Sequence, residues 1–107
     1  MYKLMSGDRV IARATKTPEG IRMVAIKNIP QHQLPFGLYG RFDRSVTMYK
    51  FIEWASERCF PEERIGASEL LKELGLDRYD GWEIVKKTNG VLMTDSFWID
   101  FGSGLNT

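Results

Sequence analysis

The chain has few of the residues that build metal centres and disulfide frameworks. Its 107 residues include one cysteine, Cys59, and one histidine, His32. A single cysteine cannot form an internal disulfide, and these two side chains cannot supply the four ligands of a standard Cys/His zinc site. We therefore expect no disulfide, no metal ion and no cofactor.

Long apolar runs are also absent. No stretch approaches the roughly 18 apolar residues of a membrane span, and the first residues, MYKLMSGDR, lack the apolar segment of a signal peptide. We therefore expect no membrane association and a cytoplasmic location. Since 43% of the residues are hydrophobic, the composition also excludes intrinsic disorder, and the length suits one domain.

The net charge is only +1, but the two halves of the chain differ. Residues 1–44 carry eight basic and three acidic side chains, whereas residues 45–107 carry seven basic and eleven acidic ones. Such asymmetry marks either a basic binding face or two layers of one domain that attract each other. Composition alone leaves both interpretations open.

Residues arranged for catalysis are missing as well. Cys59 lies on the apolar stripe of an expected helix, and His32 lies in a proline-bounded loop, so a Cys/His catalytic pair is not favoured. Phosphate-loop and HExxH motifs are absent. The paired carboxylates stand where helix caps or solvated strand ends are expected, at Glu62/Glu63, Asp77/Asp80 and Asp95/Asp100. We expect a protein that is not an enzyme.

Turn signals, together with the nearly continuous apolar run from Met23 to Ile26, predict a small antiparallel sheet over residues 1–28. Its strands are expected at 1–5, 9–15 and 21–27, with a type I turn at 17–20. Residues 29–44 should be irregular, because Pro30 and Pro35 disfavour helix there. That segment is apolar enough to pack across the sheet or to add an edge strand.

Residues 45–89 predict three helices. The first, 45–59, is capped by Asp43 or Ser45 and buries a stripe that runs from Met48 to Cys59. Pro61 ends it and opens the second helix, 62–74, whose buried stripe is Ala67, Leu70, Leu71 and Leu74.

Helix-end signals complete the pattern. Gly75 and Leu76 should end the second helix in a Schellman motif. Asp80 and Glu83 form a capping-box-like pair at the start of the third, 81–89. One or two terminal strands follow at 91–93 and 97–101, and 102–107 should be loose. The expected fold is a single α+β domain: an N-terminal antiparallel sheet, three helices and a C-terminal strand that returns to the sheet.

Two kinds of binding surface are open to such a domain. Residues 62–89 outline a helix-turn-helix, but they carry seven acidic and five basic side chains, which suits a phosphate-tracking surface poorly. A nucleic-acid regulator would use basic side chains of the sheet or the third helix, namely Arg9, Arg13, Arg22, Lys27, Lys86 and Lys87. A protein-binding module would instead use aromatic anchors, for which Tyr39, Trp82 and Trp98 are candidates.

A spaced pattern from Leu34 to Ile99 adds a resemblance. Its elements are Leu34-Pro35-x-Gly37, Arg44, Trp54, Arg58-x-x-Pro61-x-x-Arg64-x-Gly66, Leu70, Leu74 and Gly90-x-x-x-x-Asp95-x-Phe97-Trp98-Ile99. This order resembles the accessory segment that precedes the kinase-like region of HipA-like proteins in Gram-positive gut bacteria and their mobile elements. No phosphate-binding loop or catalytic loop follows here, so kinase activity does not carry over.

The resemblance implies a detached module that docks on a kinase-like partner, as split toxin–antitoxin systems would require. Arg58 and Arg64 join the candidate partner-binding residues, although both can equally bind helix-end carbonyls or Asp95. Our leading hypothesis is a non-catalytic protein-interaction module, either monomer or homodimer. The alternative is a nucleic-acid-binding regulator.

Overall fold

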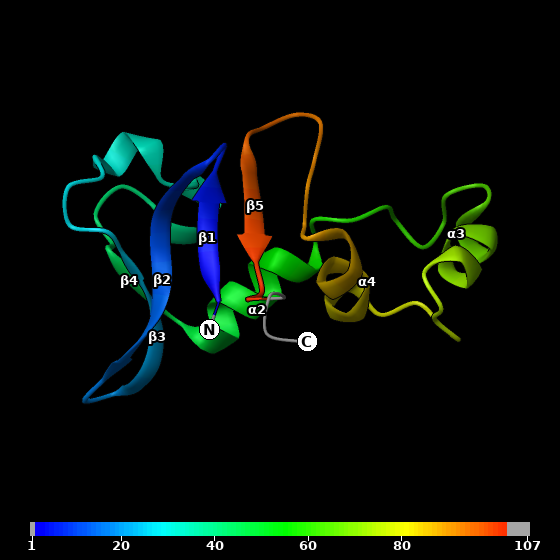
Figure 1. The fold of residues 1–107 in the computed structure, drawn as a ribbon, viewed down its shortest axis with the longest axis horizontal. Helices are drawn as coiled ribbons and strands as arrows, with labels where there is room; N and C mark the ends of the chain where they lie inside the picture. Colours follow the sequence, from blue (N-terminus) through cyan, green and yellow to red (C-terminus); the bar gives the residue numbers. More distant parts are fainter. Residues whose placement is uncertain (1, 103–107) are drawn as a thin grey trace.

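The computed structural model describes residues 2–102 as one antiparallel sheet with helices packed on one of its faces (Figure 1). The sheet has five strands in the order β4-β3-β2-β1-β5. They are β1 (Lys3–Ser6), β2 (Arg9–Thr17), β3 (Gly20–Ala25), β4 (Ser45–Thr47) and β5 (Phe97–Asp100). The predicted α+β class is confirmed, and the C-terminal strand does return to the sheet, where it pairs with β1.

Side-chain alternation decides which face of the sheet becomes the core. Ala12 lies opposite Ala25 and Ala14 opposite Met23, and these four side chains point to the helical side. Leu4 and Ile99 continue that face across β1 and β5. The hairpin between β2 and β3 turns at residues 18–19, as the proline and glycine of that segment predict.

The prediction that residues 29–44 contain no helix is wrong. A 3-10 turn, η1 (Gln31–Gln33), follows Pro30 directly, and a one-turn helix, α1 (Phe36–Tyr39), follows Pro35. Both prolines stand just before the first helical residue, where the missing N–H is not needed. The segment packs on the sheet, as its apolar residues suggest, and buries Leu34, Leu38 and Tyr39.

The first long helix is shorter than predicted at both ends. Residues Ser45–Thr47 form the edge strand β4 beside β3, and helix α2 (Met48–Ser56) begins only after Thr47, whose side chain accepts the Lys50 N–H. Thr47 is therefore the cap, rather than Asp43 or Ser45. Because α2 ends at Ser56, Cys59 lies beyond it and Pro61 neither ends this helix nor opens the next one.

The second predicted helix starts five residues late and stands apart from the body. Helix α3 (Ala67–Glu73) begins after Gly66, which is left-handed with φ 86°. Its end is as predicted: Gly75 is left-handed and the Leu76 N–H donates to the Leu71 carbonyl at 2.9 Å. Of the predicted stripe only Ala67 is buried, because α3 projects away from the sheet (Figure 1).

The third predicted helix is α4 (Gly81–Thr88), and its cap is confirmed. Asp80 accepts the N–H groups of Trp82 and Glu83. Glu83 does not complete the capping box, since it pairs with Lys86 at 2.8 Å. Residues 91–93 form no strand. The predicted loose tail lies outside the described residues from 103 onward.

The core fills the space between the inner face of the sheet and α1, α2 and α4. The largest fully buried side chains belong to these layers: Leu4, Ile11, Met23, Leu38, Tyr39, Phe51, Ile84, Val85 and Ile99. No helix within residues 2–102 has the length and apolar character that a bilayer span requires.

Candidate protein-docking groove

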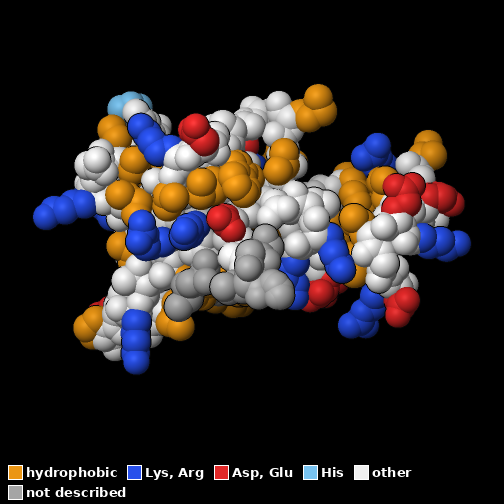
Figure 2. Space-filling model, viewed as in Figure 1, with side chains coloured by type: hydrophobic (Ala, Val, Ile, Leu, Met, Phe, Trp, Pro, Cys, Tyr) orange, Lys and Arg blue, Asp and Glu red, His pale blue; other side chains and the backbone are white. Residues whose placement is uncertain are grey.

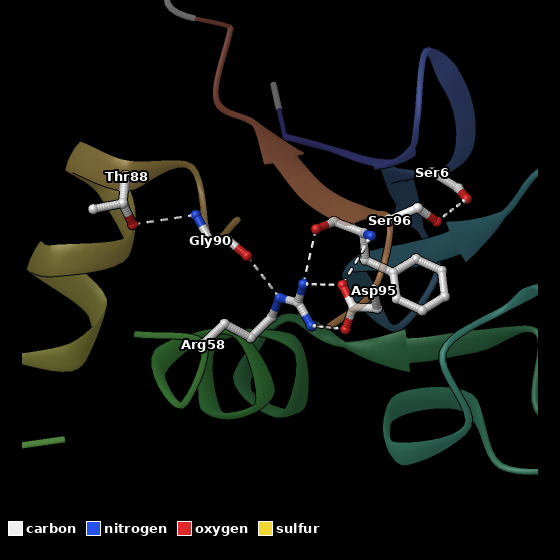
Figure 3. A network of polar contacts seen from close by, with 7 residues as sticks. Ser6, Arg58, Thr88, Gly90, Asp95 and Ser96 are labelled. Atoms are coloured by element: carbon white, nitrogen blue, oxygen red, sulfur yellow. Dashed lines mark hydrogen bonds and ion pairs between the residues drawn. The ribbon is translucent and has the colours of Figure 1, made fainter. Parts of the chain in front are cut away.

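Arg58 is the centre of a polar network at the end of α2 (Figure 3). Its side chain is 6% exposed and every nitrogen of the guanidinium group has an acceptor. Nη1 and Nη2 donate to the two carboxylate oxygens of Asp95 at 3.0 and 2.7 Å, and Nη2 also donates to the Phe97 carbonyl at 2.8 Å. Nε donates to the Gly90 carbonyl at 2.9 Å. One side chain thus holds both ends of the loop that joins α4 to β5.

Asp95 completes the network from the loop side. Its Oδ1 also accepts the Phe97 N–H at 3.0 Å, which is the turn-capping role that a carboxylate can take before a strand. The hydrogen bonds from Arg58 hold the pKa of Asp95 below its ordinary value. The centroid of the Trp54 ring lies 4.8 Å from the Arg58 guanidinium carbon, so the guanidinium group also makes a cation–π contact with the indole. The pair is therefore ionised, and the Arg58 side chain is shielded while that of Asp95 stays 30% exposed.

The loop that this network fixes forms one wall of an open groove. The groove has a volume of about 310 Å³, and its lining residues are Arg58, Cys59, Phe60, Arg64, Ile84, Thr88, Val91, Leu92 and Met93. Val91 is 59% exposed and Met93 is fully exposed. Ile65, next to Arg64 in the chain, is 98% exposed. Exposed apolar side chains around a hollow mark an interaction surface more often than a solvated one.

The other wall is held by Tyr79. Its hydroxyl donates to the Phe60 carbonyl at 2.7 Å and lies 3.3 Å from the Cys59 sulfur. The hydrogen bond with Cys59, together with burial, raises the pKa of Tyr79 to about 12. His32 lines a separate hollow of about 410 Å³ beside Phe36 and Arg41, so the structure does not bring it to Cys59.

Only two of the five candidate partner-binding residues meet in this groove. Arg58 and Arg64 line it, but Arg58 is occupied by the loop, so it positions the site rather than contacting a partner. Tyr39 was expected to be an exposed anchor, yet it is fully buried and its hydroxyl donates to the Met23 carbonyl at 3.0 Å. That expectation is wrong, because α1 turns the ring onto the sheet.

The two candidate tryptophans lie elsewhere. Trp82 is half-buried and packs edge-to-face against Tyr2 and Phe101, with ring centroids 5.9 and 5.6 Å away. Trp98 lies on the face of the sheet opposite to the core, and its indole N–H donates to the Gly7 carbonyl at 2.7 Å. Neither side chain contributes to the groove.

The candidate nucleic-acid residues are partly engaged within the chain. Arg9 bonds Gln33, Arg22 bonds the Ser45 hydroxyl at 2.6 Å, and Lys86 pairs with Glu83. The remaining candidates, Arg13, Lys27 and Lys87, are exposed. They lie on separate elements rather than along one groove.

Sequence reasoning missed the apolar rim, because Val91–Met93 looks like a strand. The signal was the run of three apolar residues directly after Asn89-Gly90, with no polar residue to form an alternating face. Comparisons with protein families, curated proteins and solved structures find no match for the chain.

Proposed function

We propose that this chain is a non-catalytic interaction module whose groove receives an apolar side chain of a protein partner. The exposure of Val91 and Met93 around the hollow is the observation that carries the proposal. Burying such side chains stabilises a complex by about 25 cal/mol for each Å² removed from water. The Arg58–Asp95 pair holds the wall in place before binding, which lowers the ordering cost of association.

The charge at the rim indicates the chemistry of the partner. Arg64 is exposed and has no ion-pair partner among residues 2–102. An arginine beside apolar side chains is the arrangement that interface cores use to place an acidic group. The partner segment should therefore carry an acidic residue next to its apolar anchor.

The resemblance to the accessory segment of HipA-like proteins supports a kinase-like partner. Several of the residues that carry it have a common physical role here, since Arg58, Gly90 and Asp95 fix the groove wall. A kinase-like protein that lacks its own accessory segment would present the matching surface. The module would then act by contact, as an antitoxin or a regulatory subunit does.

The test measures binding of the purified chain to such a HipA-like kinase region by biolayer interferometry. The paired change Val91→Ser and Met93→Ser should weaken binding at least about tenfold, as loss of a central apolar anchor does. Ile21→Ser is the matched control, because Ile21 is also exposed but lies on the β2–β3 hairpin. Unchanged binding in the groove variant would refute the proposal. So would salt-sensitive binding to a DNA duplex that persists without the kinase region, which favours the nucleic-acid alternative.

A further inference from the structure

The outer face of the sheet is not covered by any helix of residues 2–102. Figure 1 shows α2, which packs on the inner face, passing behind the lower ends of β1 and β5, so the outer face looks toward the viewer. The register places Trp98, Met5 and Val10 side by side across β5, β1 and β2 on this face, where Met5 is buried and the other two side chains are half-buried. Outward positions of a solvated antiparallel sheet are usually polar. This apolar ridge leaves Trp98 and Val10 partly exposed, so another layer can pack on it.

Basic side chains flank this ridge. On the outer face Lys3 lies between Arg13 of β2 and the acidic Asp100 of β5, and Arg22 follows one row further along β3. Neither Lys3 nor Arg13 forms an ion pair within residues 2–102. Residues 3–25 carry five basic and two acidic side chains, so this end of the molecule is positive. The occupant of the face should be acidic and partly apolar.

The opposite end of the same chain has that chemistry. Residues 62–80, here called the arm, carry six acidic and three basic side chains. Figure 2 shows mainly basic groups over the sheet and both acidic and basic groups at the α3 end. The arm also presents half-exposed leucines, among them Leu70 beside Glu73 on α3. A helix of seven residues without extensive packing on the body is not stable in water by itself.

We propose that a second copy of the chain covers the outer face, with the arm of each copy on the sheet of the other. The sheet and the arm lie at opposite ends of the 41 Å long axis and are accessible from the same side (Figure 2). A two-fold axis parallel to the strands, in front of the sheet, brings each arm over the partner's sheet. Both contacts then form at once, as in an isologous dimer. The groove at Val91 and Met93 is a separate surface, so this inference is independent of the proposed function.

Sedimentation equilibrium of the full chain tests the dimer. At low salt the mass should reach twice 12.3 kDa, and about 0.5 M salt should weaken the association. Arg13→Glu and Glu73→Lys should each raise the dissociation constant at least about tenfold. A mixture of the two variants should dimerise again, because each contact in the mixed dimer regains opposite charges. Lys16→Glu is the matched control at the exposed end of the hairpin and should leave the dimer unchanged.

Two outcomes would overturn the proposal. One is a wild-type chain that sediments as a monomer at every concentration. The other is a mixture of the two charge variants that associates no better than either alone. Circular dichroism of each variant keeps these outcomes separate from misfolding, since both substitutions lie at exposed positions.

Discussion

At the scale of single residues, Arg58 holds the loop between α4 and β5 in place. Arg58→Ala removes the partner of Asp95 and leaves the Gly90 and Phe97 carbonyls without their donor. Leaving these acceptors without their donor costs about 2 kcal/mol. Urea denaturation should show that loss in the free energy of unfolding. Arg58→Lys should recover only part of it, because an ammonium group cannot make the bidentate contact.

Arg64→Ala serves as the control for this change. Arg64 lines the same groove but is exposed, and surface substitutions of this kind change stability by about 0.5 kcal/mol or less. Equal losses for the two arginines would contradict the structural role assigned to Arg58.

The Arg58–Asp95 pair makes the free energy of unfolding depend on pH in the acid range. The folded-state pKa of Asp95 lies below its ordinary value of 3.8, so folding is stabilised by the ionised carboxylate. That contribution is complete above the ordinary value and is lost as pH falls through the folded-state pKa. Unfolding free energies measured from about pH 5 to about pH 2 should therefore fall less steeply in Asp95→Asn than in the wild type. Parallel curves would show that Asp95 is not linked to folding.

Residue pairing was only partly predictable from the sequence. Helix-end carbonyls or Asp95 were the expected structural partners of Arg58, and the side chain binds the Gly90 carbonyl after α4 as well as Asp95. The burial of Tyr39 was not predictable, because composition and spacing do not tell which way a tyrosine turns. It follows from α1, which brings the hydroxyl to the Met23 carbonyl.

At the scale of elements, Gly81 allows α4 to cross α2 closely. A Cβ built on Gly81 would lie 2.3 Å from the Ser56 carbonyl oxygen. Gly81→Ala should therefore force the helices apart and lower the unfolding free energy by at least about 2 kcal/mol, although alanine is the better helix former in isolation. Thermal unfolding followed by circular dichroism measures the effect.

Gly37→Ala is the matched control, because Gly37 is also helical. Its added Cβ would meet only the Trp54 ring at 3.7 Å, an ordinary contact, so stability should stay the same or rise slightly. A loss as large as that of Gly81→Ala would show that the close approach of Gly81 to the Ser56 carbonyl does not explain the sensitivity.

Elements with strong local signals were predictable, whereas those defined by tertiary pairing were not. Turn residues and an apolar run predicted the first three strands, and Asp80 predicted the start of α4. Residues Ser45–Thr47 look helical in sequence but form β4, because pairing with β3 decides their conformation. Tertiary context overrides weak local preference in this way.

At the scale of the whole molecule, the charge asymmetry of the sequence becomes an asymmetry in space. One expected explanation was that two layers of the domain attract each other. Instead, the arm projects from the body while the basic strands lie at the far end of the long axis (Figure 1). Length and composition give no sign of this projection, because both describe a chain that has enough apolar residues for one core.

The projection predicts uneven stability, which native-state hydrogen exchange can measure. Backbone amides of α3 and of its C-cap residue Leu74 should exchange orders of magnitude faster than those of β1 and β2 at low protein concentration, because α3 can open while the sheet stays folded. If a second copy covers the arm, its protection should rise with protein concentration, and the rise should be absent in Arg13→Glu. Exchange of α4 provides the internal reference, since Ile84 and Val85 are fully buried against the body and should not depend on concentration. If α3 is protected from exchange as strongly as β2 in a dilute sample, the arm is part of the cooperative core. The arm would then be stable without a second copy, which contradicts this argument for the dimer.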